Sequence, residues 1–206
     1  MFKKILLGVL AVLVVFLVLV AMRPADFEVS RTAIVNAPAA FAFAQVNDFK
    51  AWADWSPWDK LDPAIKRTYG DISAGQGATY HWLGNDQVGE GKMTITDAQA
   101  PNHVGIDLEF IKPFPSKNRT EFNFATSGSG TSVTWSMKGR HDFMGKLFGL
   151  FMNMDKMIGG DFEKGLGDIK RLAEAAATKQ AEEAAAAAAA AQAAPADEAA
   201  LDAGTP

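Results

Sequence analysis

For about 75 residues after Pro63, apolar and polar side chains alternate along the chain with a period of two. The clearest runs lie at 104–110 and 133–137, and Gly- and Ser-rich turns such as 127–130 separate them. Because successive side chains of a strand point to opposite faces of a sheet, these runs predict strands with one apolar face and one polar face. The short turns favour antiparallel neighbours. The stretch therefore predicts about six antiparallel strands that need a cover on one side only.

The cover is predicted between Phe143 and Leu172, where apolar residues recur every three or four positions, as they do along one face of a helix. Gly159 and Gly160 interrupt this stripe and predict a kink or break in the helix. The elements expected before the alternating region are a strand at 27–35, a helix that Pro38 opens and that runs through Asp48, and a short second helix that Pro57 breaks. A long helix laid on a curved sheet buries both apolar faces, so the pattern predicts an α+β domain.

The N-terminal segment is a second constraint, because Lys3 and Lys4 precede an uncharged apolar run at 5–22. A helix of this length spans roughly 27 Å, close to the hydrocarbon core of a bilayer. Leu19–Met22 offers no small-residue cleavage site, so a retained membrane anchor is favoured over a cleaved signal peptide. Two lysines before the run, against Arg23 alone just after it, leave the N-terminus in the cytoplasm. We predict a single-pass protein of the inner (cytoplasmic) membrane with a periplasmic or otherwise extracytoplasmic domain.

The chain divides into three predicted parts. Residues 1–24 form the anchor, 25–174 the globular domain, and 175–206 an Ala-rich, low-complexity tail. The tail has no apolar stripe to bury, although alanine favours helix, so its start is expected to extend the preceding helix. The rest is predicted to be a solvated tail rather than a binding element.

Composition and spacing exclude several classes of function. The chain has no cysteine, which rules out disulfides, thiolate metal sites and a cysteine nucleophile. A net charge of −4 without a basic cluster gives no general attraction to nucleic acid. His81, His103 and His141 are far apart, and none has metal-ligand spacing to another His, Asp or Glu. We predict no nucleic-acid partner, no metal, no cofactor and no catalytic residue.

Four segments carry a resemblance to a known superfamily: Val35–Pro38, Trp52–Asp59, 143–152 and 161–170. In these segments the chain, from Phe27 to about Glu174, resembles the START-like superfamily, also called SRPBCC or Bet v 1-like, which includes the polyketide cyclase/dehydrase and lipid transport families. The resemblance implies a helix-grip fold, in which a curved antiparallel sheet of about seven strands wraps around a long C-terminal helix over an internal cavity. Members bind lipids, sterols, polyketides or plant metabolites, and a minority catalyse reactions on them.

The apolar phase of the sheet and the start of the long helix are the candidate ligand-binding surfaces. Segment 143–154 is apolar on nearly every side, with Lys146 and Asn153 as the main exceptions. Such a helix must be buried on both sides, line an opening, or touch the membrane. The same residues are also what a filled core would use. The predicted ligand-binding residues are Tyr80, Trp82, Met93, Phe110, Phe122, Phe124, Trp135, Met137, Met144, Phe148 and Phe151.

Three further residues allow two interpretations each. Phe114, between prolines in a loop, either closes an entrance or dips into lipid, or folds back on the domain. Arg31 and Arg67 share a phase with apolar neighbours. An inward arginine could bind a carboxylate or phosphate head group, but snorkelling at a sheet edge is the favoured interpretation.

These observations predict a membrane-anchored, extracytoplasmic binding module for a hydrophobic small molecule or lipid, held to the membrane by residues 5–22. Its affinity would come mainly from apolar burial. One alternative is an enzyme resembling a polyketide cyclase or dehydratase, which requires an acid or base inside the cavity. Another is an interaction module whose apolar helix docks on a protein of the cell envelope.

Overall fold

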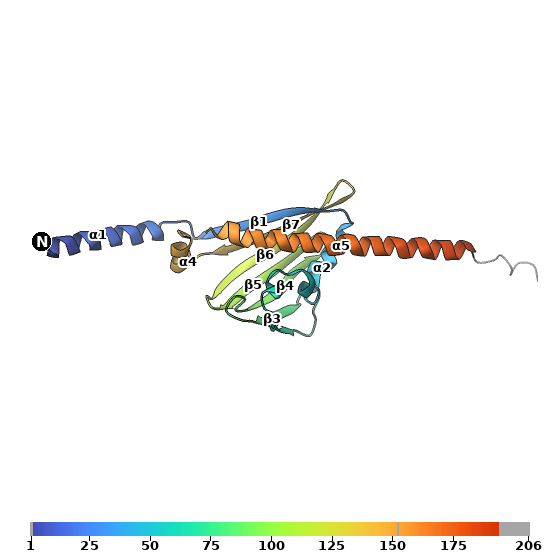
Figure 1. Ribbon diagram of the computed structural model, residues 1–206, viewed down its shortest axis with the longest axis horizontal. Coiled ribbons are helices and arrows are strands. Elements are labelled where there is room, and N and C mark those ends of the chain that lie inside the picture. The colour runs from blue at the N-terminus through green and yellow to red at the C-terminus, as the bar shows by residue number, and fades with distance from the viewer. Residues whose placement is uncertain (1, 152, 194–206) are drawn as a thin grey trace, which may run out of the picture.

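The computed structural model describes residues 2–151 and 153–193, which form one antiparallel sheet, a long C-terminal helix and a separate N-terminal helix (Figure 1). The sheet has seven strands in the order β1-β7-β6-β5-β4-β3-β2. The strands are β1 (Asp26–Val35), β2 (Lys66–Tyr69), β3 (Thr79–Leu83), β4 (Glu90–Gln99), β5 (His103–Lys112), β6 (Ser116–Ser127) and β7 (Gly130–Arg140). The helices are α1 (Phe2–Ala21), α2 (Ala39–Asn47), α3 (Trp52–Trp55), the 3-10 helix η1 (Trp58–Lys60), α4 (Phe143–Phe148) and α5 (Met154–Ala193). The predicted α+β architecture is confirmed.

The register of the strands explains the alternation in the sequence. Strands β2 to β7 follow one another as a meander, and β1 joins the sheet by pairing with β7. Phe122 on β6 lies opposite Trp135 on β7 and Val104 on β5, and all three side chains are buried. Because successive side chains along a strand point to opposite faces, the residues before and after each of these three point to the other, polar face.

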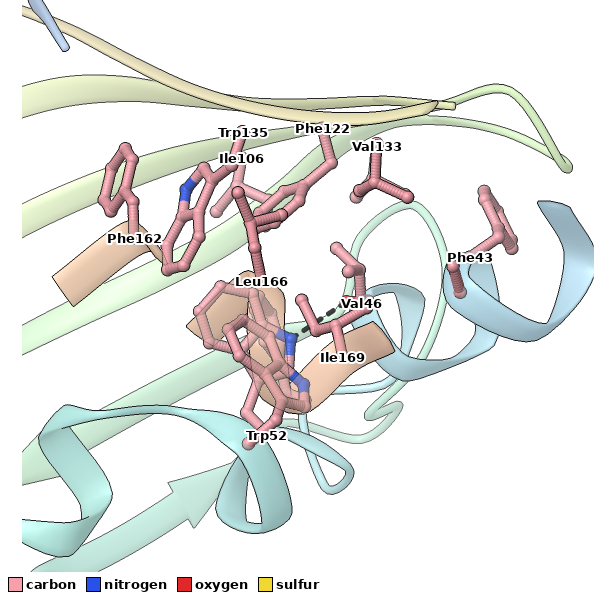
Figure 2. Close-up of a cluster of buried hydrophobic side chains, with 14 of the residues drawn as sticks. Phe43, Val46, Trp52, Ile106, Phe122, Val133, Trp135, Phe162, Leu166 and Ile169 are labelled. Carbon is pink, nitrogen blue, oxygen red and sulfur yellow. Dashed lines mark hydrogen bonds between the residues drawn. The ribbon is translucent and has the colours of Figure 1, made fainter. Parts of the chain in front are cut away.

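Helix α5 covers the apolar face of the sheet and lies along β1 (Figure 1). Its buried face carries Phe162, Leu166 and Ile169, which meet the side chains of α2, α3 and the strands in one cluster (Figure 2). The ring of Phe162 stacks on Trp135, with ring centres 3.9 Å apart and planes 8° from parallel. This stack joins the helix to the centre of the sheet.

The sequence predicted a helix from 143 to 172 with a kink or break at Gly159 and Gly160. The structure has the break elsewhere, so the predicted position of the break is wrong. The chain leaves the helix after Phe148 and begins α5 at Met154. Asn153 caps the new helix, because its side-chain oxygen accepts a hydrogen bond from the backbone N–H of Lys156 at 2.9 Å. Helix α5 then runs through the two glycines without interruption.

Gly159 is needed because another side chain packs against it, not because the helix bends there. The guanidinium of Arg31 lies against the backbone at Gly159, so a Cβ there would collide with it, whereas nothing lies close to Gly160. Arg31 donates hydrogen bonds from β1 to Asp155 and Glu163 on α5, at 3.1 and 2.9 Å. Gly159 therefore lets β1 and α5 approach closely enough for these ion pairs.

Alanine substitutions at the two glycines should separate these roles. We expect Gly160→Ala to raise the free energy of unfolding by about 0.5–1 kcal/mol, because alanine favours helix and its methyl group meets nothing. Gly159→Ala should lose that gain, since Arg31 has to move. Urea denaturation of both variants measures the difference, and equal stabilisation by the two would contradict this explanation.

Helix α5 continues past the predicted domain boundary at 174. It reaches Ala193, and its last turns, with the alanines at 184–191, are exposed. The predicted extension of the helix into the Ala-rich segment therefore runs farther than its start. Residues 194–206 of the predicted tail lie outside the described residues.

Helix α1 stands apart from the sheet (Figure 1). Its side chains are exposed from end to end, apart from Val20. Within the described part of the chain, α1 is the helix whose length and composition would allow it to cross a membrane; a signal sequence has the same properties. A helix with this much exposed apolar surface requires a non-aqueous environment or removal.

Candidate functional site

A cavity of about 580 Å³ lies between the apolar face of the sheet, η1, α4 and the first turns of α5. This volume is within the range of sites that hold one small molecule. Aromatic and aliphatic side chains form most of its wall, among them Trp82, Met93 and Phe110 on the sheet and Ile158 and Phe162 on α5. The first turns of α5 pack closely on β1 at the edge of the sheet, where Arg31 lies against Gly159. The cavity lies between these turns and the strands farther along the sheet.

The cavity opens on its α4 side. The lining residues on the η1 side, such as Trp52 and Tyr80, are buried. Those on the α4 side are exposed, including Phe114, Met144 and Met157. We call the opening between α4 and the β5–β6 loop (113–115) the mouth.

The predicted ligand-binding residues fall into three groups. Eight of them line the cavity: Tyr80, Trp82, Met93, Phe110, Trp135, Met137, Met144 and Phe148. Phe122 packs instead behind Trp135, and Phe124 packs against Phe43 of α2. Phe151 lies beyond the mouth with 79% of its surface exposed. The structure thus separates cavity wall, core and surface within a set that shares one apolar pattern.

A charged pair, of which one member lines the cavity, lies on the η1 side. Asp59 of η1 lines the cavity, and its carboxylate accepts a hydrogen bond of 2.7 Å from Nε of Arg67 on β2. The Asp59 side chain is only 7% exposed. Burial lowers the pKa of Arg67, but the hydrogen bond and the charge of Asp59 outweigh it, so the pKa lies above its ordinary value and the guanidinium stays cationic. Arg67 therefore points inward, as one interpretation of the sequence had it, but toward a carboxylate of the chain itself.

The wall also carries other polar residues, among them Asn118, Thr120 and His141. Burial raises the pKa of the Tyr80 phenol well above its ordinary value, so this hydroxyl stays protonated and able to donate. The indole N–H of Trp135 is buried and has no hydrogen-bond partner among the described residues. Tyr80 and Trp135 both line the cavity. A mainly apolar wall with polar groups of this kind suits a ligand that is mostly hydrocarbon or aromatic and carries some polar atoms.

Sequence patterns did not indicate Asp59. It sits in a short 3-10 turn after Pro57, where an aspartate is ordinarily solvated. Its contact with Arg67 depends on how this turn folds over β2, which local periodicity does not contain. The only sequence signal was the inward phase of Arg67, whose charge needs a partner.

No arrangement elsewhere suggests a metal centre. Within 2–151 and 153–193, no group of three or more His, Asp or Glu side chains could hold a metal ion. His81 contacts Glu90, and His103 contacts Asn123. A more open groove of about 840 Å³ crosses the polar face of the sheet, where its charged residues are solvated or pair with one another, as Arg119 does with Asp107.

A family model described as "Polyketide cyclase / dehydrase and lipid transport" matches residues 26–174. No curated protein matches the chain. Solved structures with the same fold include protein CV1439 from Chromobacterium violaceum, with a TM-score of 0.53, 13% identity, and coverage of 71% of this chain and 96% of that one. An uncharacterised protein from Rhizobium leguminosarum has a TM-score of 0.55 and 13% identity, with 74% and 97% covered.

The di-domain ARO/CYC protein BexL of the BE-7585A biosynthetic pathway also shares the fold, with a TM-score of 0.55 and 13% identity. The match covers 75% of this chain and 52% of BexL. At such identities the likeness shows the fold alone. The match covers almost the whole of the first two structures.

Proposed function

This chain belongs to the polyketide cyclase / dehydrase and lipid transport family, and from this premise we propose that it is a membrane-anchored, extracytoplasmic module that binds a hydrophobic small molecule or lipid. The membership confirms the resemblance predicted from the sequence. The observation that carries the proposal is the cavity of about 580 Å³ with its mainly apolar wall. Each methylene group moved from water into such a wall contributes about 0.8 kcal/mol to binding.

The anchor in this proposal is α1. Its twenty residues span about 30 Å, the thickness of a bilayer's hydrocarbon core. Lys3 and Lys4 precede its apolar run and Arg23 follows it, which favours a cytoplasmic N-terminus. Only a few residues separate α1 from β1, so the domain is held close to the membrane.

Filling the cavity tests the binding function. Residues 25–206, which contain the whole fold, would be titrated with the uncharged fluorescent probe phenylnaphthylamine. We expect Leu108→Trp, on the cavity wall, to weaken probe binding at least tenfold, because the indole occupies the space. Ile34→Trp, at an exposed position of β1, should leave binding unchanged. A wild-type domain that binds no probe, and carries no apolar molecule detectable by mass spectrometry, would sink the proposal.

The second candidate is an enzyme of the cyclase or dehydratase type, and one observation favours it. Asp59 places a carboxylate in the cavity wall, near the phenol of Tyr80, where an acid or base would act. BexL, which shares the fold, is described as ARO/CYC. Mass spectrometry of molecules extracted from the wild-type domain and Asp59→Asn distinguishes the candidates. An enzyme would leave unconverted substrate in the variant, whereas a binding module would yield the same molecule from both.

A further inference from the structure

The mouth of the cavity lies at the same end of the domain as α1. Figure 1 shows α4 beside the junction of α1 and β1, at the opposite end of the domain from the β6–β7 turn. Asp142 caps the N-terminus of α4, and its carboxylate accepts a hydrogen bond of 2.7 Å from the backbone N–H of Gly145. Lys146 of α4 donates a hydrogen bond of 2.9 Å to the carbonyl of Ala21, the last residue of α1. One wall of the mouth is therefore fastened to the end of the candidate membrane span.

Helix α4 is not part of the core. None of its residues is buried, and its main packing partner is α1 rather than the sheet. Its side chains are nevertheless apolar, and residues 143–151 carry a single charge, on Lys146. A segment this apolar that covers no part of the core leaves its surface for another environment.

The opposite wall of the mouth shows the same property. Phe114, at the tip of the β5–β6 loop, is 69% exposed, and its ring centre lies 6.1 Å from that of Phe148 on α4. Phe151, just after α4, is exposed as well. Aromatic side chains from two separate elements thus form one exposed patch around the entrance. We call this the entrance patch; its members are Phe114, Met144, Phe148, Leu150 and Phe151.

We propose that the entrance patch inserts into the surface of the bilayer that α1 crosses, so that the cavity opens to the lipid phase and takes its ligand from there. This inference rests on the proposed function and names the partner surface of the same site. The argument is continuity: α4 is bonded to Ala21, so an α1 that spans the bilayer brings α4 to the membrane surface. Apolar side chains at that depth leave water for the acyl boundary.

Two cations near the patch fit the same partner, while the carboxylate of Asp142 is engaged by the backbone N–H of Gly145. Arg23 and Lys146 lie at the end of α1 and on α4, and neither pairs with a carboxylate within the part of the chain that the structure describes. Cations at this level face the phosphates of lipid head groups. A protein partner fits less well, because a bilayer crossed by α1 already fills the space around the end of α1.

Depth measurements on the full chain in vesicles test the proposal. Because the chain has no cysteine, single cysteines can be labelled cleanly. Phe114→Cys and Phe151→Cys would carry the fluorophore NBD at the patch, and Ser129→Cys would carry it in the exposed β6–β7 turn. In vesicles of phosphatidylcholine and phosphatidylglycerol we expect nitroxide-labelled lipids to quench the two patch labels at least threefold more than the Ser129 label. Equal, weak quenching at all three positions overturns the proposal, as does a patch label shielded by a co-purifying protein.

A transfer assay tests the consequence for the ligand. Phe151→Glu should slow the movement of phenylnaphthylamine from vesicles into the full-length protein about tenfold, while Ile34→Glu, the same change at an exposed position away from the mouth, leaves the rate unchanged. A drop in equilibrium affinity that accounts for the whole change in rate would place Phe151 in the cavity wall and overturn the proposal. The quenching result does not depend on probe binding, so failure of the proposed function and failure of this inference remain distinguishable.

Discussion

Replacing Trp135 with alanine is expected to lower the free energy of unfolding by about 4 kcal/mol. The side chain is 2% exposed and stacks between two rings, Phe162 of α5 and Phe122 of β6, with ring centres 3.9 and 4.8 Å away (Figure 2). Removing the indole deletes apolar burial and also leaves a void, because the backbones of sheet and helix restrict the collapse that would fill it. The loss should be the largest of any single aromatic truncation that we consider.

Two further variants serve as comparisons for the loss of stability in Trp135→Ala. Trp135→Phe keeps a ring in the stack and removes an N–H that has no partner among the described residues, so we expect it to cost about 1 kcal/mol. Trp58→Ala removes an indole that is only half-buried, with an expected cost of about 1–2 kcal/mol. Urea denaturation of residues 25–206 gives all three values. A loss at Trp135→Ala no larger than that at Trp58→Ala would show that the stack does not hold helix to sheet.

The architecture was predictable from the sequence because its signal is local. Strand alternation depends only on which face each residue occupies, and the apolar stripe of α5 depends only on helical spacing. The predicted break in the C-terminal helix was misplaced because a sequence does not show why a helix contains glycine. A glycine that breaks a helix and a glycine that makes room for a packed neighbour look the same. Gly159 accommodates Arg31 from a strand far away in the chain, and that contact carries no local signature.

The cavity was less predictable, because core and cavity wall use the same residues. Phe122 and Trp135 sit opposite each other on neighbouring strands with the same pattern. Whether such a side chain meets empty space depends on where α3, η1 and α5 cross the sheet. The same limit applies to Asp59, whose role as a buried partner of Arg67 follows from tertiary packing. Local patterns therefore identify the face that carries a site but not the part of it left open.

The pair of Asp59 and Arg67 beside the cavity should be the second most sensitive point of the domain. Arg67→Met removes the partner of a carboxylate that is only 7% exposed, and we expect it to lower the free energy of unfolding by about 2–3 kcal/mol. This expected loss of stability is smaller than that for a fully buried pair, because the Arg67 side chain keeps 27% of its surface exposed. Most of the cost arises from the unpaired charge left on Asp59 rather than from the loss of attraction itself.

A double variant separates these two contributions. Asp59→Asn in the background of Arg67→Met removes the stranded charge, so we expect it to recover more than half of the lost stability, a coupling that denaturant titrations of the four proteins would measure. A double variant as unstable as the sum of both single changes would mean that the pair acts through packing instead.

The same four proteins bear on function, since an uncharged, unpaired wall should bind phenylnaphthylamine at least as tightly as the wild type. If recovery of stability came with loss of probe binding, the ion pair would be holding the cavity open rather than merely being tolerated within its wall.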